Sequence, residues 1–435
     1  MTGNYKKLGA LLCGLVLTVG LAGSAAAAHK THQHARHHHK NAPGVSKHQI
    51  TIGGTFPLTG PAALYKTVPE AEQAYFAYVN AHGGVHGRKI KDIVLDDQYN
   101  PAETVSLAKK LVEHYHVFAD VGSLGTAPGL ATWGYLNQQK VPQVLLATGD
   151  AYWGNCVHRA CDHSGIAKSW TMGWQADYPA EGRLYAKYIL AHKPNARIGV
   201  IYQNDAYGKN LLGPFKHALG SHASQIVDAE GANATDSAQV VGAHVVALAQ
   251  HGADTFLIFG TPPIAIPALA TEGQIPGWTP LTFVNFVGAD RVFMLLAGQN
   301  GAKLDGVIST TFLASPTTQA SLAGMKLAKK IIKATGNQDL MKSFLEGDGN
   351  IPYGLGTAWT FVYALEHAGK NPTRESLMKA LRHMNTKKNP FLYPGTKVQT
   401  SNKRAFPIEQ SIFMKWSGGG SGDWHTFGKV LHSGH

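Results

Sequence analysis

From residue 49 onward, the chain alternates short β-rich segments with amphipathic segments of helical spacing. The candidate strands are QITIGGTF (49–56), KDIVLDD (91–97), VFADVG (117–122), PQVLLAT (142–148), RIGVIYQ (197–203), DTFLIFG (254–260), LTFVNF (281–286) and DGVIST (305–310). Helical patterns lie between them, at 101–115, 178–193 and 236–252, and the first has Asn100 as a candidate N-cap with Pro101 in the first turn. This alternation predicts an α/β fold with parallel sheets flanked by helices.

The alternation falls into two similar series, at 49–150 and 197–288, which predicts two lobes with one doubly wound parallel sheet each. After residue 313 come three helical segments, at 319–336, 354–369 and 373–384. Extended segments joined by a glycine-rich turn follow, at 408–428. Because such late helices must pack on an earlier sheet, we expect each lobe to be discontinuous in sequence.

The N-terminus has the layout of a secretory signal peptide. Lys6 and Lys7 precede an apolar run and a small-residue stretch, so residues 1–28 are predicted to be removed by cleavage near Ala28. The apolar core of about 15 residues is shorter than the roughly 20 that a membrane span needs. We therefore expect an exported, soluble protein in the periplasm, with lipidation at Cys13 as the alternative.

Residues 29–47 are rich in histidine and lack periodic apolar residues, so we expect a disordered tail. Clustered imidazoles bind transition metals weakly whether or not metal binding is their biological role. We predict no metal site or other cofactor. An exported enzyme or a metal-trafficking protein that uses this tail is a rival hypothesis.

After cleavage the chain retains two cysteines, Cys156 and Cys161, in GNCVHRACDHSG. In an oxidising compartment this spacing favours a local disulfide. A zinc knuckle that adds His158, Asp162 and His163, or a pair of free thiols, are the alternatives.

Net charge and motifs argue against several function classes. The formal charge of +12 falls to +10 when the signal peptide and its two lysines are removed, and the basic residues are scattered, so no nucleic-acid partner is expected. The sequence lacks a nucleophile elbow, a zincin motif, a phosphate loop and a dinucleotide fingerprint. Asp96 and Asp97 are adjacent strand residues that point to opposite faces, which favours structural hydrogen bonding. We therefore expect no enzyme.

Polar, small or aromatic segments follow several predicted strands, where ligands bind in open parallel sheets. They are FPLTGPAALY (56–65), GSLGTAPG (122–129), ATGD (147–150) and QNDAYG (203–208). A helix starting near Thr126 would direct its unpaired amides into the same space, which favours a carboxylate as the ligand. The alternative is that Ser123 or Thr126 only caps a helix.

Several stretches in order resemble the periplasmic leucine/isoleucine/valine-binding proteins of ABC importers. They are PLTGPAALY (57–65), EAEQAYFAYVNAHGGVHGRKIKDIVLDDQYNPAETVSLAKKLV (70–112), KVPQVLLATGDAYWG (140–154), WTMGWQADYPAEGRLYAKYILAHKPNARIGVIYQNDAYGKN (170–210) and PIEQSIFMKW (407–416). The resemblance covers nearly all of residues 48–430. It implies a type I periplasmic-binding fold with three crossovers, near residues 173, 313 and 400. Lobe 1 would comprise residues 48–173 and 313–400, and lobe 2 residues 174–312 and 401–435.

The resemblance also implies a ligand site in the cleft. Ser123 would hold the ligand carboxylate, with nearby amides from Gly125 and Thr126. The segment from Ala147 through Thr148 to Gly149 would contact the carboxylate and ammonium, although Gly149 stands where threonine is common.

In the same comparison, Tyr65 would wall the side-chain pocket and Tyr207 would close over the ligand. Asn285 occupies the position of the acid that usually pairs with the ligand ammonium, with Asp290 five residues later. Another acid such as Asp205, or main-chain carbonyls, would then have to serve an ammonium.

We therefore expect a monomeric substrate-binding subunit that delivers a branched-chain or other hydrophobic amino acid to an ABC permease at the inner membrane. Because of Asn285, an aromatic or short organic acid is the alternative ligand. A periplasmic ligand sensor with the same fold is the alternative role.

Overall fold

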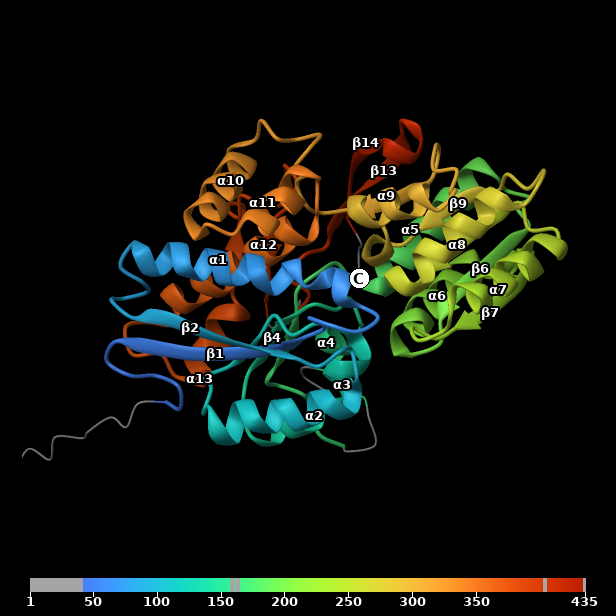
Figure 1. Cartoon of the computed structure of the whole chain (residues 1–435). Coiled ribbons are helices and arrows are strands. Elements are labelled where there is room, and N and C mark those ends of the chain that lie inside the picture. Colours follow the sequence, from blue (N-terminus) through green and yellow to red (C-terminus); the bar gives the residue numbers. More distant parts are fainter. Residues whose placement is uncertain (1–41, 157–160, 162–164, 402–404, 433–435) are drawn as a thin grey trace, which may run out of the picture. The chain divides into compact units, whose positions relative to one another are not determined.

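A computed structural model describes residues 42–156, 161, 165–401 and 405–432 of the chain. Within these residues, a first sheet of five parallel strands has the order β2-β1-β3-β4-β5. Figure 1 labels β1, β2 and β4 of this sheet. Its strands are β1 (Gln49–Phe56), β2 (Lys89–Asp96), β3 (Asp120–Val121), β4 (Gln143–Leu146) and β5 (Thr171–Gly173).

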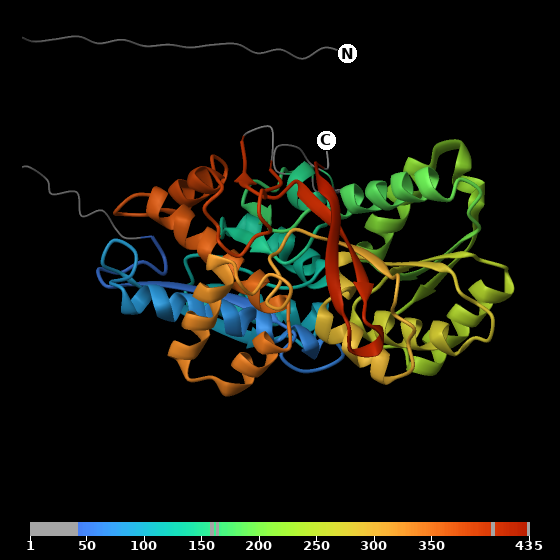
Figure 2. The same cartoon turned by 90° about the horizontal axis from the view of Figure 1, so that it is seen from above.

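A second sheet, of seven strands in the described chain, has the order β14-β13-β10-β9-β8-β6-β7. Its strands are β6 (Ile198–Gln203), β7 (Ile226–Ala232), β8 (Thr255–Phe259), β9 (Leu281–Val284), β10 (Ile308–Thr311), β13 (Gln410–Ser417) and β14 (Asp423–His432). The strands from β6 to β10 pair in parallel, whereas β13 and β14 form an antiparallel hairpin beside β10 (Figure 2). The predicted α/β fold is confirmed, and the hairpin makes the second sheet mixed rather than purely parallel.

The first lobe, defined as the first sheet and the helices packed on it, is built from two stretches of the chain. Figure 1 shows α10, α11 and α12 beside α1, although they are far apart in sequence. The helices of this lobe are α1 (Thr67–Ala81), α2 (Pro101–Lys109), α3 (Thr126–Gln138), α4 (Tyr152–Asn155), α10 (Ala323–Thr335), α11 (Gln338–Leu345), α12 (Asn350–His367) and α13 (Arg374–Leu381). The predicted N-cap is confirmed, because the Asn100 side chain accepts a hydrogen bond from the Ala102 N–H.

The second lobe consists of the second sheet and the helices α5 (Tyr178–His192), α6 (Ala206–Leu219), α7 (Ala238–Gln250), α8 (Pro262–Gln274) and α9 (Arg291–Gln299). The described chain passes from one lobe to the other after β5, after β10 and before β13. A short antiparallel pair, β11 (Asn385–Thr386) and β12 (Val398–Gln399), precedes the last passage.

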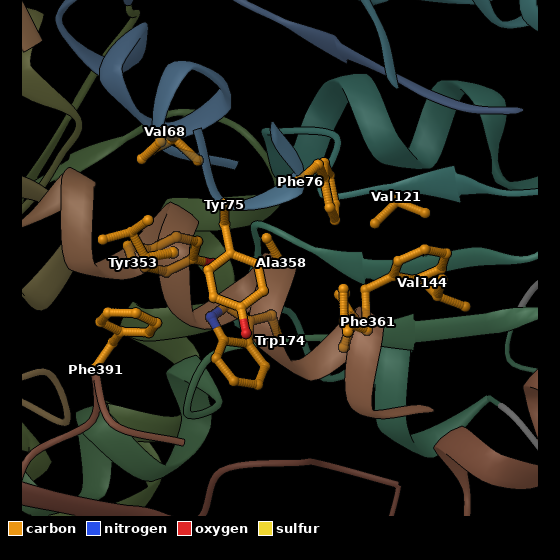
Figure 3. Close-up of a cluster of buried hydrophobic side chains, with 14 of the residues drawn as sticks. Val68, Tyr75, Phe76, Val121, Val144, Trp174, Tyr353, Ala358, Phe361 and Phe391 are labelled. Atoms are coloured by element: carbon orange, nitrogen blue, oxygen red, sulfur yellow. The ribbon is translucent and has the colours of Figure 1, made fainter. Parts of the chain in front are cut away.

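Aromatic side chains fill the core of the first lobe between α1 and α12 (Figure 3). The rings of Phe76 and Phe361 meet edge to face with centroids 6.1 Å apart, and Trp174 is fully buried. Gly354 lets the two helices approach closely, because a Cβ there would lie 2.2 Å from the carbonyl oxygen of Val68. Burial of these rings supplies much of the apolar stabilisation of the lobe.

Residues 42–47, which we assigned to the tail, pack on the first lobe instead. Val45 is buried and forms a bridge with Ile50, and the Gly44 carbonyl accepts a hydrogen bond from the Thr51 N–H. The predicted signal peptide (1–28), residues 29–41 of the tail and the three candidate zinc ligands near the cysteines lie outside the described residues. In the part of the chain that is described, no helix combines the length and apolar character of a membrane span.

Cys156 and Cys161 form a disulfide with their Cα atoms 5.4 Å apart, which confirms the predicted pairing. Cys156 is buried against Leu146, Trp133 and Trp153, so the bridge ties Cys161 to the core of the first lobe.

We predict that Cys156→Ala combined with Cys161→Ala lowers the free energy of unfolding by about 2 kcal/mol, because the unfolded chain gains loop entropy. Urea denaturation of the oxidised protein and of the variant would measure the difference. Reductant should destabilise the native protein and leave the variant unchanged. An equal effect of reductant on both proteins would contradict the prediction.

Candidate functional site

A cavity with an empty volume of about 1070 Å³, part of it open to solvent, is lined by residues of both lobes. Many of its lining residues follow the carboxyl ends of the parallel strands in the two sheets, and others come from the β13–β14 hairpin and from α12 and the turn before it. From the first lobe come Tyr65, Tyr99, Gly125, Thr126, Ala147 and Tyr353, and from the second Tyr178, Tyr207, Thr261, Phe286, Asp290 and Trp424. The position agrees with the rule that ligands bind beyond the carboxyl ends of parallel strands.

The N-terminus of α3 forms one wall of the cavity. Gly125 precedes the helix with a φ of +116°, and a Cβ there would lie 2.7 Å from the Tyr99 ring, so glycine is required on both counts. The helix begins at Thr126, and the N–H groups of Thr126 and Ala127 have no acceptor within the helix, whereas Pro128 has no N–H. These groups and the helix dipole make this wall attractive to an anion.

Ser123 lies behind this wall rather than in it. It is buried, it is not among the lining residues, and its hydroxyl donates to Asp120 Oδ1 at 2.6 Å. The Ser123 hydroxyl oxygen in turn accepts a hydrogen bond from the Thr55 N–H at 2.9 Å. The hydroxyl hydrogen is thus used within the lobe, and Ser123 positions the loop before α3 instead of offering its proton to the cavity.

The segment after β4 reaches the cavity at Ala147 only. The Thr148 hydroxyl lies 2.7 Å from the Thr126 hydroxyl and accepts from the Asp150 N–H. Gly149 packs against Tyr178, because a Cβ there would lie 2.8 Å from that ring. Thr148 and Gly149 therefore support the wall from behind.

The predicted tyrosines both line the cavity. Tyr65 donates its hydroxyl hydrogen to the Val287 carbonyl at 2.8 Å, which joins the two lobes. Tyr207 donates to Asn285 Oδ1 at 2.7 Å, and Asn285 itself is fully buried and does not line the cavity. Burial raises the pKa of both tyrosines well above the ordinary value, so the cavity wall here is uncharged.

Tyr99, Gln175, Tyr178 and Tyr353 line the cavity although we did not predict them as site residues. Tyr99 follows β2 in a polar stretch, so the rule used for the other loops could have found it. Tyr353 donates to Gln175 Oε1 at 3.0 Å, a contact between α12 and the first passage between the lobes. Their separation of 178 positions gives no sequence signal for this pair.

Asp290 and Arg291, at the start of α9, bind the turn between α11 and α12 in the other lobe. Asp290 Oδ2 accepts from the Gly349 N–H at 2.7 Å, and Arg291 donates to the Glu346 carbonyl. We call these two contacts the clasp. Burial raises the pKa of Asp290 well above its ordinary value, and the neighbouring Asp348 carboxyl raises it further.

Three buried carboxyl groups lie close together in the first lobe, on Glu72, Asp92 and Asp120. Burial raises the pKa of all three, to about 7 for both Asp92 and Asp120, although the hydrogen bond from Ser123 lowers the pKa of Asp120 in part. Asp96 and Asp97 lie at the end of β2 and accept hydrogen bonds from the Thr59 and Thr104 hydroxyls, respectively, as expected for structural roles.

A two-lobed α/β fold with a cavity at the carboxyl ends of both sheets defines a type I periplasmic binding protein. The chain matches the family described as periplasmic binding protein over residues 49–421, and it belongs to this family. The predicted resemblance is thereby confirmed. The family consists of solute-binding proteins rather than enzymes.

Among curated proteins, the chain is similar to Leu/Ile/Val-binding protein homolog 1 of Brucella suis biovar 1, with 23% identity over 398 residues. This match covers 86% of the chain and 92% of the relative. The Leu/Ile/Val-binding protein of Escherichia coli is 27% identical over 189 residues, which covers 42% of the chain and 48% of that protein.

Two solved structures share the fold. One is a branched-chain amino acid ABC transporter protein from Thermus thermophilus with bound valine, with a TM-score of 0.75 and 17% identity over 89% of this chain and 97% of that one. The other is a fatty acid ABC transporter substrate-binding protein from Thermomonospora curvata, with a TM-score of 0.70 and 21% identity over 89% and 94%.

We predict that Asp120→Asn flattens the dependence of stability on pH between about 4 and 7. The folded chain retains the Asp120 proton up to about pH 7, whereas the unfolded chain releases it near pH 4. The stabilisation from this proton is therefore complete below pH 4 and is lost as the pH rises to 7. Urea unfolding at a series of pH values would measure the slope.

Asp96→Asn is the matched control. Burial raises the pKa of Asp96, but hydrogen bonds from Thr59, Gln98 and Leu58 outweigh this effect and hold it below the ordinary value. The stability that the ionised Asp96 carboxylate contributes is lost only as the pH falls below about 4. The Asp96→Asn variant should therefore keep the native dependence of stability on pH between pH 5 and 7. A native slope in Asp120→Asn as well would refute the assignment.

Proposed function

We propose that the chain is the periplasmic substrate-binding subunit of an ABC importer and that it captures a small carboxylate-bearing solute with a hydrophobic body. The observation that carries this proposal is the cavity, which combines the N-terminus of α3 with a largely aromatic and aliphatic wall. Of the residues predicted from the sequence, Tyr65, Gly125, Thr126, Ala147 and Tyr207 would contact the solute, and the others would hold these in place.

The two ends of the proposed solute match two parts of the wall. Its carboxylate would accept hydrogen bonds from the first turn of α3 and from the Thr126 hydroxyl. Its hydrophobic body would lie against Tyr207 of the second lobe and Tyr65 of the first, with Leu124, Phe286 and Val287 nearby. Most of the binding free energy would then come from removing apolar surface from water.

Contacts to both lobes explain how binding would be reported to a permease. A solute that touches α3 on one side and Tyr207 on the other favours the arrangement in which the lobes meet. The hydrogen bond from Tyr65 to Val287 and the clasp stabilise the same arrangement. The permease would recognise the lobes in this position.

The names of the relatives support the same chemistry. The related proteins are named for leucine, isoleucine and valine, and the structural neighbours for valine and for fatty acids. All of these ligands have a carboxylate and an aliphatic body. We therefore propose for the ligand of this chain only the two features that these ligands share, the carboxylate and the aliphatic body.

Calorimetric titration with leucine, valine, benzoate and octanoate tests the proposal, with glucose as a ligand that lacks a carboxylate. We expect at least one carboxylate to bind in the micromolar range or more tightly and glucose not to bind. Binding of glucose alone, or of none of the carboxylates, would refute the proposal.

We predict that Tyr65→Phe weakens the binding of that solute about fivefold to tenfold, because it removes one hydrogen bond between the lobes, worth about 1 kcal/mol. Tyr78→Phe, on α1 outside the cavity, is the matched control and should retain native affinity. Titration of the three proteins at one pH gives the comparison. Equal affinities would show that the Tyr65 hydroxyl does not contribute to binding.

A further inference from the structure

Few of the residues described around the cavity carry a formal charge. They are Asp290, Arg291 and Asp423, all from the second lobe. The charge that a ligand meets depends on whether these groups already have partners.

Each carboxylate oxygen of Asp290 already accepts a hydrogen bond from a main-chain donor. Its Oδ1 accepts from the Val292 N–H at 2.8 Å and its Oδ2 from the Gly349 N–H at 2.7 Å. Burial and the neighbouring Asp348 also raise the pKa of Asp290, which favours its neutral form. It is therefore a poor partner for a cation.

Asp423 and Arg291 neutralise each other. Arg291 Nε lies 2.9 Å from Asp423 Oδ2. The other oxygen, Asp423 Oδ1, accepts a hydrogen bond from the backbone N–H of the next residue, Trp424, at 2.7 Å. The pair adds no net charge to the cavity, and the Asp423 carboxylate has its counter-ion.

The acids behind the wall do not reach the cavity. Asp205 accepts from the Tyr207 and Gly208 N–H groups and from Gln203 Nε2, and Glu181 accepts from the Tyr185 hydroxyl and the Phe286 N–H. Neither lines the cavity. Each carboxylate therefore uses its hydrogen bonds to stabilise the second lobe.

The main-chain carbonyls after β4 are also engaged. The Ala147 oxygen accepts from the Gly125 N–H at 3.2 Å, and the Gly149 oxygen accepts from the Tyr178 N–H at 2.7 Å. The remaining acceptors at the wall are uncharged oxygens and aromatic rings, which compensate only in part for the hydration that a buried ammonium loses.

We propose that the solute carries a carboxylate and no charged amine: the cavity pairs the anion-attracting N-terminus of α3 with a wall whose acidic side chains are all already hydrogen-bonded or ion-paired. This inference rests on the proposed function and specifies its substrate class. Hydrophobic monocarboxylates, aliphatic or aromatic, fit the site, whereas the corresponding α-amino acids would bury an unpaired ammonium.

Matched pairs of ligands test the inference with the full mature chain. Leucine and 4-methylpentanoate differ only by the amine, as do phenylalanine and 3-phenylpropanoate. At pH 7.5 we expect the amine-free member of the better-binding pair to bind at least about 100-fold more tightly, because a buried ammonium without a counter-charge is strongly disfavoured. Titration calorimetry gives the two dissociation constants.

Gln175→Glu supplies the missing charge. Gln175 lines the cavity and its Oε1 accepts from Tyr353, so glutamate keeps the shape and this acceptor while adding a negative charge. We expect the preference for the amine-free ligand to fall at least about tenfold in this variant. Gln139→Glu, at the far end of α3, adds the same charge away from the cavity and should leave the preference unchanged.

Thermal unfolding of both variants establishes that they are folded before binding is compared. If leucine or phenylalanine binds as tightly as its amine-free partner, the inference is overturned while the proposed function stands. If no carboxylate in the set binds, the proposed function fails and the inference fails with it.

Discussion

The parallel pairing of β1 with its neighbours is the constraint on which the site depends. It brings the ends of β1, β2 and β3 to one edge of the sheet, where their loops must share one space. Ser123 fixes this arrangement by bonding to Thr55 on β1 and to Asp120 on β3. Those two bonds tie the loop that leads into α3 to the first sheet.

Polar contacts between the lobes involve few side chains and several main-chain groups. Tyr65 reaches a carbonyl of the second lobe, whereas Asp290 and Arg291 reach the Glu346–Gly349 turn of the first. Together with apolar contacts such as that between Tyr65 and Phe293, they stabilise one arrangement of the lobes, and a ligand that touches both lobes adds to that preference. Among the described residues that line the cavity, each acidic side chain already has a hydrogen-bond or ion-pair partner.

Much of the fold could be predicted from the sequence because most strands are continuous runs of apolar and β-branched residues between turn signals. The prediction missed β5, which has three residues, and β7, an edge strand with Asp228 and Glu230 in it. For the site, sequence order located the loops but not the direction of each side chain. Ser123 and Thr126 are three positions apart, yet only Thr126 lines the cavity, because hydrogen bonds to β1 and β3 turn Ser123 inward.

The hairpin of β13 and β14 also limits the order in which the second lobe can fold. Trp416 and Trp424 belong to the core of the second lobe, and the Trp424 indole N–H donates to the Ala289 carbonyl. Because the hairpin follows all the other strands and helices of the second lobe in sequence, this lobe cannot complete its core until the hairpin has been added. Until then β10 lacks its antiparallel partner β13, which lies more than 100 residues downstream, and an unpaired strand edge of this kind is prone to aggregate during folding.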